Sequence, residues 1–139
     1  YAIVDSCGNI TNTIEKGKPF TVRMKVQMHA PIEYPIFALS IKDAKGTEIT
    51  GTNTMFEKTD FEVGPIMEIS FEQDMNLQGG EYLLSLGCTG YNGTDFTVYH
   101  RLYDVCNITV VSDKNTVGYY DMNSKITVQT YEGTNICRK

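Results

Sequence analysis

Residues 20–28 read FTVRMKVQM, and this stretch decides the fold class. Its apolar side chains, at Phe20, Val22, Met24, Val26 and Met28, alternate with polar ones. A period of two puts the apolar set on one face of an extended strand and the polar set on the other. The stretch therefore predicts a β-strand with one buried face and one face in water.

Strand patterns recur along most of the chain. We predict further strands over residues 2–5, 36–42, 47–54, 66–75, 82–88 and 125–129, and over 97–103 and 105–111 either two strands or one bent strand. Glycine-containing stretches at 43–46, 78–80 and 89–95 separate several of them as turns or loops. No stretch combines a helical apolar period with helix caps. Many short strands with wet outer faces predict an all-β, antiparallel sandwich.

Composition and charge narrow the class of protein further. A chain of 139 residues without internal repeats is read as one domain, 1–139. Its net charge of -5 and the lack of a basic stripe argue against nucleic-acid binding. No apolar run is long enough for a membrane-spanning helix or a signal peptide. The four cysteines have no C-x-x-C spacing, which argues against zinc, and we expect them to be reduced.

Motifs for catalysis are missing from the sequence. The only Gly-Lys pair, Gly17-Lys18, is followed by a proline and a strand, so it is not a phosphate-binding loop. His29 and His100 are the only histidines, and neither lies in a recognisable nucleophile or zinc motif. Acidic residues on the strand at 66–75 share one face and are interpreted as a solvated surface. We expect no catalytic residue, no metal ion and no cofactor.

Tyrosines gather in the second half of the chain. We predict a carbohydrate-binding group from the 89–95 loop and the strand that follows it: Tyr91, Asn92, Tyr99, Arg101 and Tyr103. The last three alternate, so an extended segment would project them from one face. Aromatic rings offer a flat apolar surface to a sugar, and polar side chains bind its hydroxyl groups. The alternative is that the tyrosines are core residues that suit strands, with Arg101 a buried partner of Asp104 or Glu81.

Five segments, taken in order, resemble a known family. They are GKPFTVRMKV (17–26), YPIFALSIKDAKGTEI (34–49), GTNT (51–54), LQGGEYLLSLG (77–87) and VCNITV (105–110). Their order is similar to that in the C-terminal domain of Wzt, the ATPase subunit of bacterial polysaccharide ABC transporters. Ala38 stands where the family commonly has Gly, and Ile108 stands where it commonly has Phe. Both departures are conservative for packing.

The resemblance implies a fold, a function and a location. The fold would be an immunoglobulin-like β-sandwich. The domain would bind a lipid-linked cell-surface polysaccharide (a glycolipid of the O-antigen kind) without catalysis, as part of a larger chain with a separate ATPase domain. That chain would work with a transmembrane permease subunit, in the cytoplasm at the inner face of the membrane. The resemblance does not supply a set of binding residues.

The resemblance also bears on assembly, because some members of the family exchange a C-terminal strand in a dimer. With the alternating pattern at 125–129, this predicts a homodimer in which residues 117–139 are exchanged and residues 113–120 form the hinge. Two other interpretations stay open. One is an extracellular adhesion or carbohydrate-binding sandwich with disulfides and N-glycans, and the weaker one is a fragment of a glycoside hydrolase.

Overall fold

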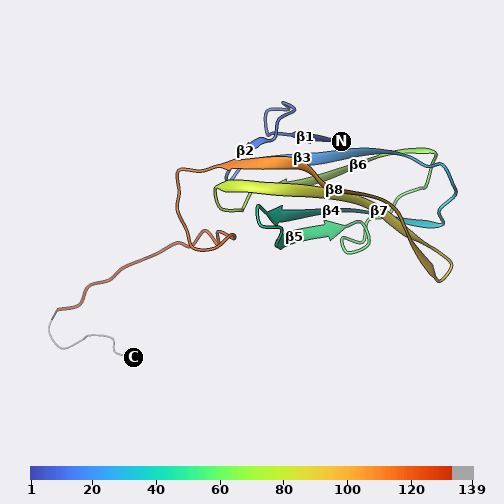
Figure 1. Cartoon of the computed structure of the whole chain (residues 1–139). Coiled ribbons are helices and arrows are strands. Elements are labelled where there is room, and N and C mark those ends of the chain that lie inside the picture. Colours follow the sequence, from blue (N-terminus) through green and yellow to red (C-terminus); the bar gives the residue numbers. More distant parts are fainter. Residues whose placement is uncertain (133–139) are drawn as a thin grey trace.

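The computed structural model describes residues 1–132 and folds them into strands without a helix (Figure 1). The strands are β1 (Ala2–Val4), β2 (Thr13–Glu15), β3 (Pro19–Gln27), β4 (Tyr34–Asp43), β5 (Glu48–Asn53), β6 (Ile66–Asp74), β7 (Gly80–Asn92) and β8 (Asp95–Val111). The predicted all-β class is therefore confirmed.

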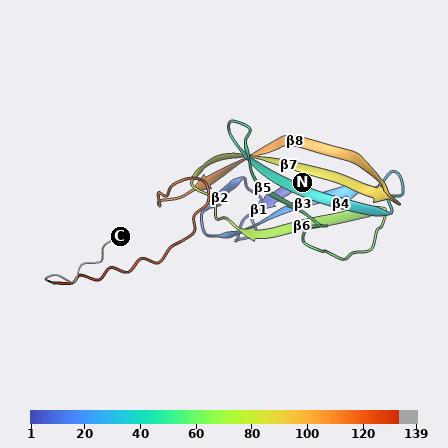
Figure 2. The ribbon, with the colours of Figure 1, turned by 90° about the horizontal axis from the view of Figure 1, so that it is seen from below.

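The strands form two sheets that lie one over the other (Figure 2). The smaller sheet has the order β1-β3-β6, and the larger has the order β2-β8-β7-β4-β5. Neighbouring strands are antiparallel except β2 and β8, which run parallel. The two long neighbours β7 and β8 form a hairpin that carries the predicted binding residues.

A single apolar core joins the two sheets. Its members are the inward-facing residues of both sheets, including Val22 and Phe71 from the smaller sheet and Phe37, Leu84 and Ile108 from the larger one. The alternation in residues 20–28 is preserved, since Phe20, Val22 and Met24 are buried while the intervening side chains are more exposed. Burial of these apolar side chains is the main contribution to the stability of the fold.

The N-terminal segment contains one strand that the sequence did not predict. No strand was predicted between residues 5 and 20, but Thr13–Glu15 pairs with residues 109–111 of β8. Ile14, at the centre of β2, is buried in the core. Three residues with one apolar side chain are too few to show a period of two, so the pattern carried no signal here.

The predicted loop at 89–95 is largely wrong. Strand β7 continues to Asn92, and the turn to β8 is confined to Gly93 and Thr94. Gly90 lies within β7. The strand needs a glycine here, because a Cβ at this position would lie 2.6 Å from the Tyr34 carbonyl oxygen. Gly93 makes the turn, with a φ of 63°. The two glycines therefore have different roles, close approach of strands at one and chain reversal at the other.

Residues Lys125–Gln129 form no strand within the single chain. These residues lie in an extended segment that leads away from the sandwich and pairs with no strand among residues 1–132 (Figure 1). Ile126 and Val128 are 82% and 81% exposed. An alternating sequence becomes a strand only beside a partner that accepts its backbone hydrogen bonds, and the described part of the fold provides none.

The predicted hinge at 113–120 is only partly free of the sandwich. The amide of Gln78 donates to the Tyr119 carbonyl at 2.7 Å, and the amide of Asp121 donates to the Asn76 carbonyl at 3.1 Å. The Tyr119 hydroxyl also donates to the Asp43 carboxylate. Residues 119–121 are thus docked on their own sandwich.

The cysteines within the described residues carry free thiols. Cys88 is buried in the core, Cys106 is half-buried and Cys7 is exposed. Burial raises the pKa of the Cys88 and Cys106 thiols above its usual value, so both behave as small apolar residues. Cys137 lies outside the described residues.

Candidate functional site

The five predicted site residues lie on the β7–β8 hairpin, in two groups. The first group is at the tip. The Asn92 side-chain amide donates to the Tyr99 hydroxyl at 3.0 Å, and its oxygen accepts from the Glu33 amide at 2.7 Å. Tyr91 packs against Phe96 with ring centroids 5.1 Å apart. Asn92 therefore ties the hairpin tip to the segment before β4 and holds the Tyr99 ring beside it.

The second group lies in the middle of β8, on the outer face of the larger sheet. Arg101 is opposite Gly87, and one of its Nη atoms donates to the Tyr103 hydroxyl at 3.2 Å. The Lys42 ammonium, from β4, lies 5.5 Å from the centroid of the Tyr103 ring. Tyr103 is nevertheless 65% exposed, so much of its ring faces water. We call Lys42, Arg101 and Tyr103 the outer-face group.

Strand β8 has two irregularities, and the first lies between the tip and the outer-face group. His100 is opposite Cys88 but Val98 is opposite Thr89, so β8 contains one extra residue at Tyr99. Such a bulge breaks the alternation of side chains. Tyr99 consequently bonds to Asn92 at the tip. The expectation that Tyr99, Arg101 and Tyr103 share one face by strict alternation does not hold.

The second irregularity bends β8 at Asp104. This residue has a φ of 50°, a left-handed conformation that is uncommon outside glycine. Ser85 stabilises the bend, because its hydroxyl accepts the Asp104 amide proton at 2.9 Å. The Asp104 carboxylate lies 3.5 Å from the Lys42 ammonium. A bulge or bend of this kind re-aims neighbouring side chains, and here it brings Tyr103 next to Lys42.

Sequence reasoning missed two members of this site, Lys42 and Ser85. Lys42 lies in β4 and Ser85 in β7, and their contacts with β8 depend on the order and register of the three strands, which no pattern within their own segments indicates. The alternative that Arg101 is a buried partner of Asp104 or Glu81 does not hold either. Arg101 is exposed, Asp104 pairs with Lys42, and Glu81 accepts from Asn107 and Thr109. Those two hydrogen bonds lower the pKa of Glu81.

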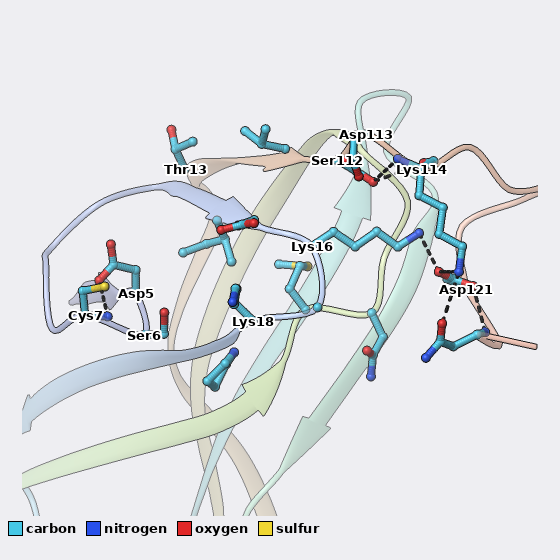
Figure 3. A pocket seen from close by; sticks show the side chains of 18 residues that line it. Asp5, Ser6, Cys7, Thr13, Lys16, Lys18, Ser112, Asp113, Lys114 and Asp121 are labelled. Atoms are coloured by element: carbon cyan, nitrogen blue, oxygen red, sulfur yellow. Dashed lines mark hydrogen bonds and ion pairs between the residues drawn. The ribbon is translucent and has the colours of Figure 1, made fainter.

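A polar pocket of about 770 Å³ occupies the end of the sandwich where β8 finishes (Figure 3). Lys16 and Lys114 point toward each other there, and both ammonium groups lie 2.8 Å from the Asp121 carboxylate. These two cations hold the pKa of Asp121 far below its usual range. The Lys16 and Asp121 side chains are each only 9% exposed. This ion triad fastens the segment after β8 to the turn between β2 and β3.

The Wzt C-terminal domain family matches residues 1–122. The chain belongs to the Wzt C-terminal domain family. A solved structure titled "Crystal structure of the C-terminal domain of wzt" has the same fold, with a TM-score of 0.82 and 23% sequence identity. The alignment covers 92% of this chain and 80% of that one. No curated protein sequence matches the chain significantly.

Membership of the Wzt C-terminal domain family supports a domain related to polysaccharide transport by ABC transporters. The family is one of non-catalytic carbohydrate-binding domains. Among residues 1–132, no three His, Cys, Asp or Glu side chains gather in a way that could hold a metal ion. The same residues contain no helix with the length and apolar character needed to cross a membrane.

Proposed function

We propose that this domain binds a cell-surface polysaccharide and selects it for export by an ABC transporter. In this proposal a separate ATPase domain of the same protein, joined to a transmembrane permease, drives transport from the cytoplasmic face of the membrane. The support comes from family membership together with the outer-face group. The domain itself contributes recognition, and hydrolysis of ATP takes place elsewhere in the assembly.

The observation that carries the proposal is the exposed ring of Tyr103 beside a fixed arginine. A tyrosine with 65% of its surface in water contributes little to the core, so packing does not explain its position. The ring offers an apolar surface to the C–H face of a sugar, and the remaining Arg101 donors bind hydroxyl oxygens. An apolar surface with a few fixed polar groups is the usual composition of a small-ligand site.

The hairpin tip supplies a second contact region in this proposal. Tyr91 and Tyr99 present aromatic surface, and Asn92 fixes Tyr99 through the bond between its amide and the tyrosine hydroxyl. A polysaccharide is long enough to touch both groups along β8. We therefore propose Tyr103 and Arg101 as primary contacts and Tyr91, Asn92 and Tyr99 as a separate, second contact region at the hairpin tip.

We also propose that the domain forms a homodimer by exchange of its C-terminal segment. The support is the alternating, exposed pattern at Lys125–Gln129, which lacks a strand partner within the described part of the chain. Because residues 119–121 are docked on their own sandwich, the exchanged segment would begin after Asn123. An edge strand of the second copy would then accept the backbone hydrogen bonds.

The experiment that tests recognition is a binding screen with surface polysaccharides purified from the source organism. Isothermal titration should detect binding to the wild-type protein and a loss of at least tenfold for Tyr103→Ala. Tyr120→Ala is the matched control, because Tyr120 is 66% exposed and lines a separate pocket that includes no member of the outer-face group. Unchanged binding by Tyr103→Ala would contradict the placement on the outer face.

A further inference from the structure

Arg101 is the member of the outer-face group whose positive charge is not balanced. Within residues 1–132 it takes part in no ion pair, and its side chain makes one hydrogen bond, to the Tyr103 hydroxyl. A guanidinium carries five N–H donors in a planar fork, so most of them are available to a ligand. We propose that the bound polysaccharide carries an anionic substituent, a carboxylate or a phosphate, that binds the Arg101 guanidinium; this inference rests on the proposed function.

The neighbouring charges favour Arg101 over Lys42 as the anion contact. Lys42 is already 3.5 Å from the Asp104 carboxylate. Asp104 therefore already has a cationic partner, and among residues 1–132 it forms no ion pair with Arg101.

The position of Arg101 is fixed before any ligand arrives. Its cross-strand partner Gly87 has no side chain, and a Cβ built there would lie 3.8 Å from Arg101 Cγ. The aliphatic stem of Arg101 therefore lies over Gly87 at van der Waals distance, and the bond to Tyr103 holds the far end. A preorganised cation costs less conformational entropy on binding than a free one.

The fork geometry selects the class of substituent. Guanidinium groups bind carboxylates and phosphates through two parallel hydrogen bonds, which neutral hydroxyls cannot match. With Tyr103 directly beside Arg101, a sugar stacked on the ring would present a charged substituent toward the guanidinium. The chain as a whole is acidic, with a net charge of -5, so attraction of an anionic glycan would be local to this face.

The test compares one polysaccharide in three forms. The source organism's surface polysaccharide is used as isolated, after chemical reduction of its carboxyl groups, and after removal of phosphate with hydrogen fluoride. We expect the wild-type protein to bind the native form and to lose at least tenfold in affinity for one of the treated forms, which identifies the substituent. Equal affinity for all three forms would overturn the charge inference and leave glycan recognition intact. Absence of binding to every form would refute the proposed function as well.

Two variants make the assignment specific to one residue. Arg101→Gln should lower affinity for the native polysaccharide at least tenfold and leave affinity for the neutralised form nearly unchanged. Arg23→Gln is the matched control, because Arg23 lies in β3 of the other sheet. If Arg101→Gln weakens binding to the native and neutralised forms equally, Arg101 binds neutral hydroxyls and the inference is wrong.

Discussion

Replacing Tyr103 with alanine should separate binding from stability. Full truncation of a buried aromatic side chain costs about 3–5 kcal/mol of unfolding free energy. Tyr103 is 65% exposed, so only about a third of that loss applies, roughly 1–1.5 kcal/mol. Tyr82 provides the comparison, because it is 2% exposed in the core and should incur the full cost. The two tyrosines lie on neighbouring strands of the same hairpin, Tyr82 in β7 and Tyr103 in β8. Tyr82 is a core residue, whereas Tyr103 is proposed as a ligand contact.

The loss of polysaccharide affinity in Tyr103→Ala can also be given a magnitude. Removing an aromatic anchor from the centre of an interface commonly costs about 2 kcal/mol or more, which is roughly 30-fold in affinity. The chain contains no tryptophan, so urea unfolding is followed by far-ultraviolet circular dichroism and binding by isothermal titration. The reasoning is refuted if Tyr103→Ala destabilises the domain as much as Tyr82→Ala, or if it binds polysaccharide like the wild type.

Three further predictions concern the frame around the site. Asp121→Asn should speed hydrogen exchange in residues 116–123, whereas Asp113→Asn, in the same pocket but with no ion pair to any of residues 1–132, should not. Since the folded pKa of Asp121 is depressed, its contribution to stability is complete at neutral pH and begins to decline below about pH 4, the ordinary range of an aspartate. It is lost only when the folded carboxylate is protonated at much lower pH, so acid titration of the wild type should loosen the same segment progressively. Gly90→Ala should lower the free energy of unfolding by about 1–3 kcal/mol, because its Cβ would meet a backbone carbonyl oxygen at 2.6 Å, while Gly64→Ala, with open space around it, should cost far less; equal melting temperatures would contradict this. Truncation after residue 123 should convert a dimer to a monomer in light scattering, and a wild-type monomer at high concentration would rule the exchange out.

Much of the fold was readable because each long strand carries its own alternation. The alternation of apolar and polar residues over 20–28 predicts that Val22 points into the core, and the alternation in β6 predicts the same for Phe71. Predictions failed where a short element depends on a distant partner. Ile14 belongs to a strand only because β8 lies beside it, and Ile126 alternates correctly but finds no such neighbour among the described residues.

The site was predictable in its residues and less so in its grouping. Tyr103 and Arg101 were found by composition and spacing, and the structure joins them. Tyr99 was placed with them by assuming an unbroken strand, and one extra residue in β8 moves it to the tip. Lys42 could not be predicted as a site residue, because its contact with Tyr103 depends on the order of strands in the sheet. Bulges and strand order are decided by tertiary packing, which local patterns do not encode.

The parallel pairing of β2 with β8 has a consequence for the order of folding. Residues 13–15 leave the ribosome early, but their partners, residues 109–111, are synthesised roughly 100 positions later, about 5–20 s at ordinary translation rates. Until then Ile14 has no strand to join and its apolar side chain stays in water. The larger sheet therefore completes at its β2 edge only after β8 has emerged, and this long-range closure should make the last folding step slow. A nascent chain stalled before residue 109 should hold residues 13–15 open to proteases.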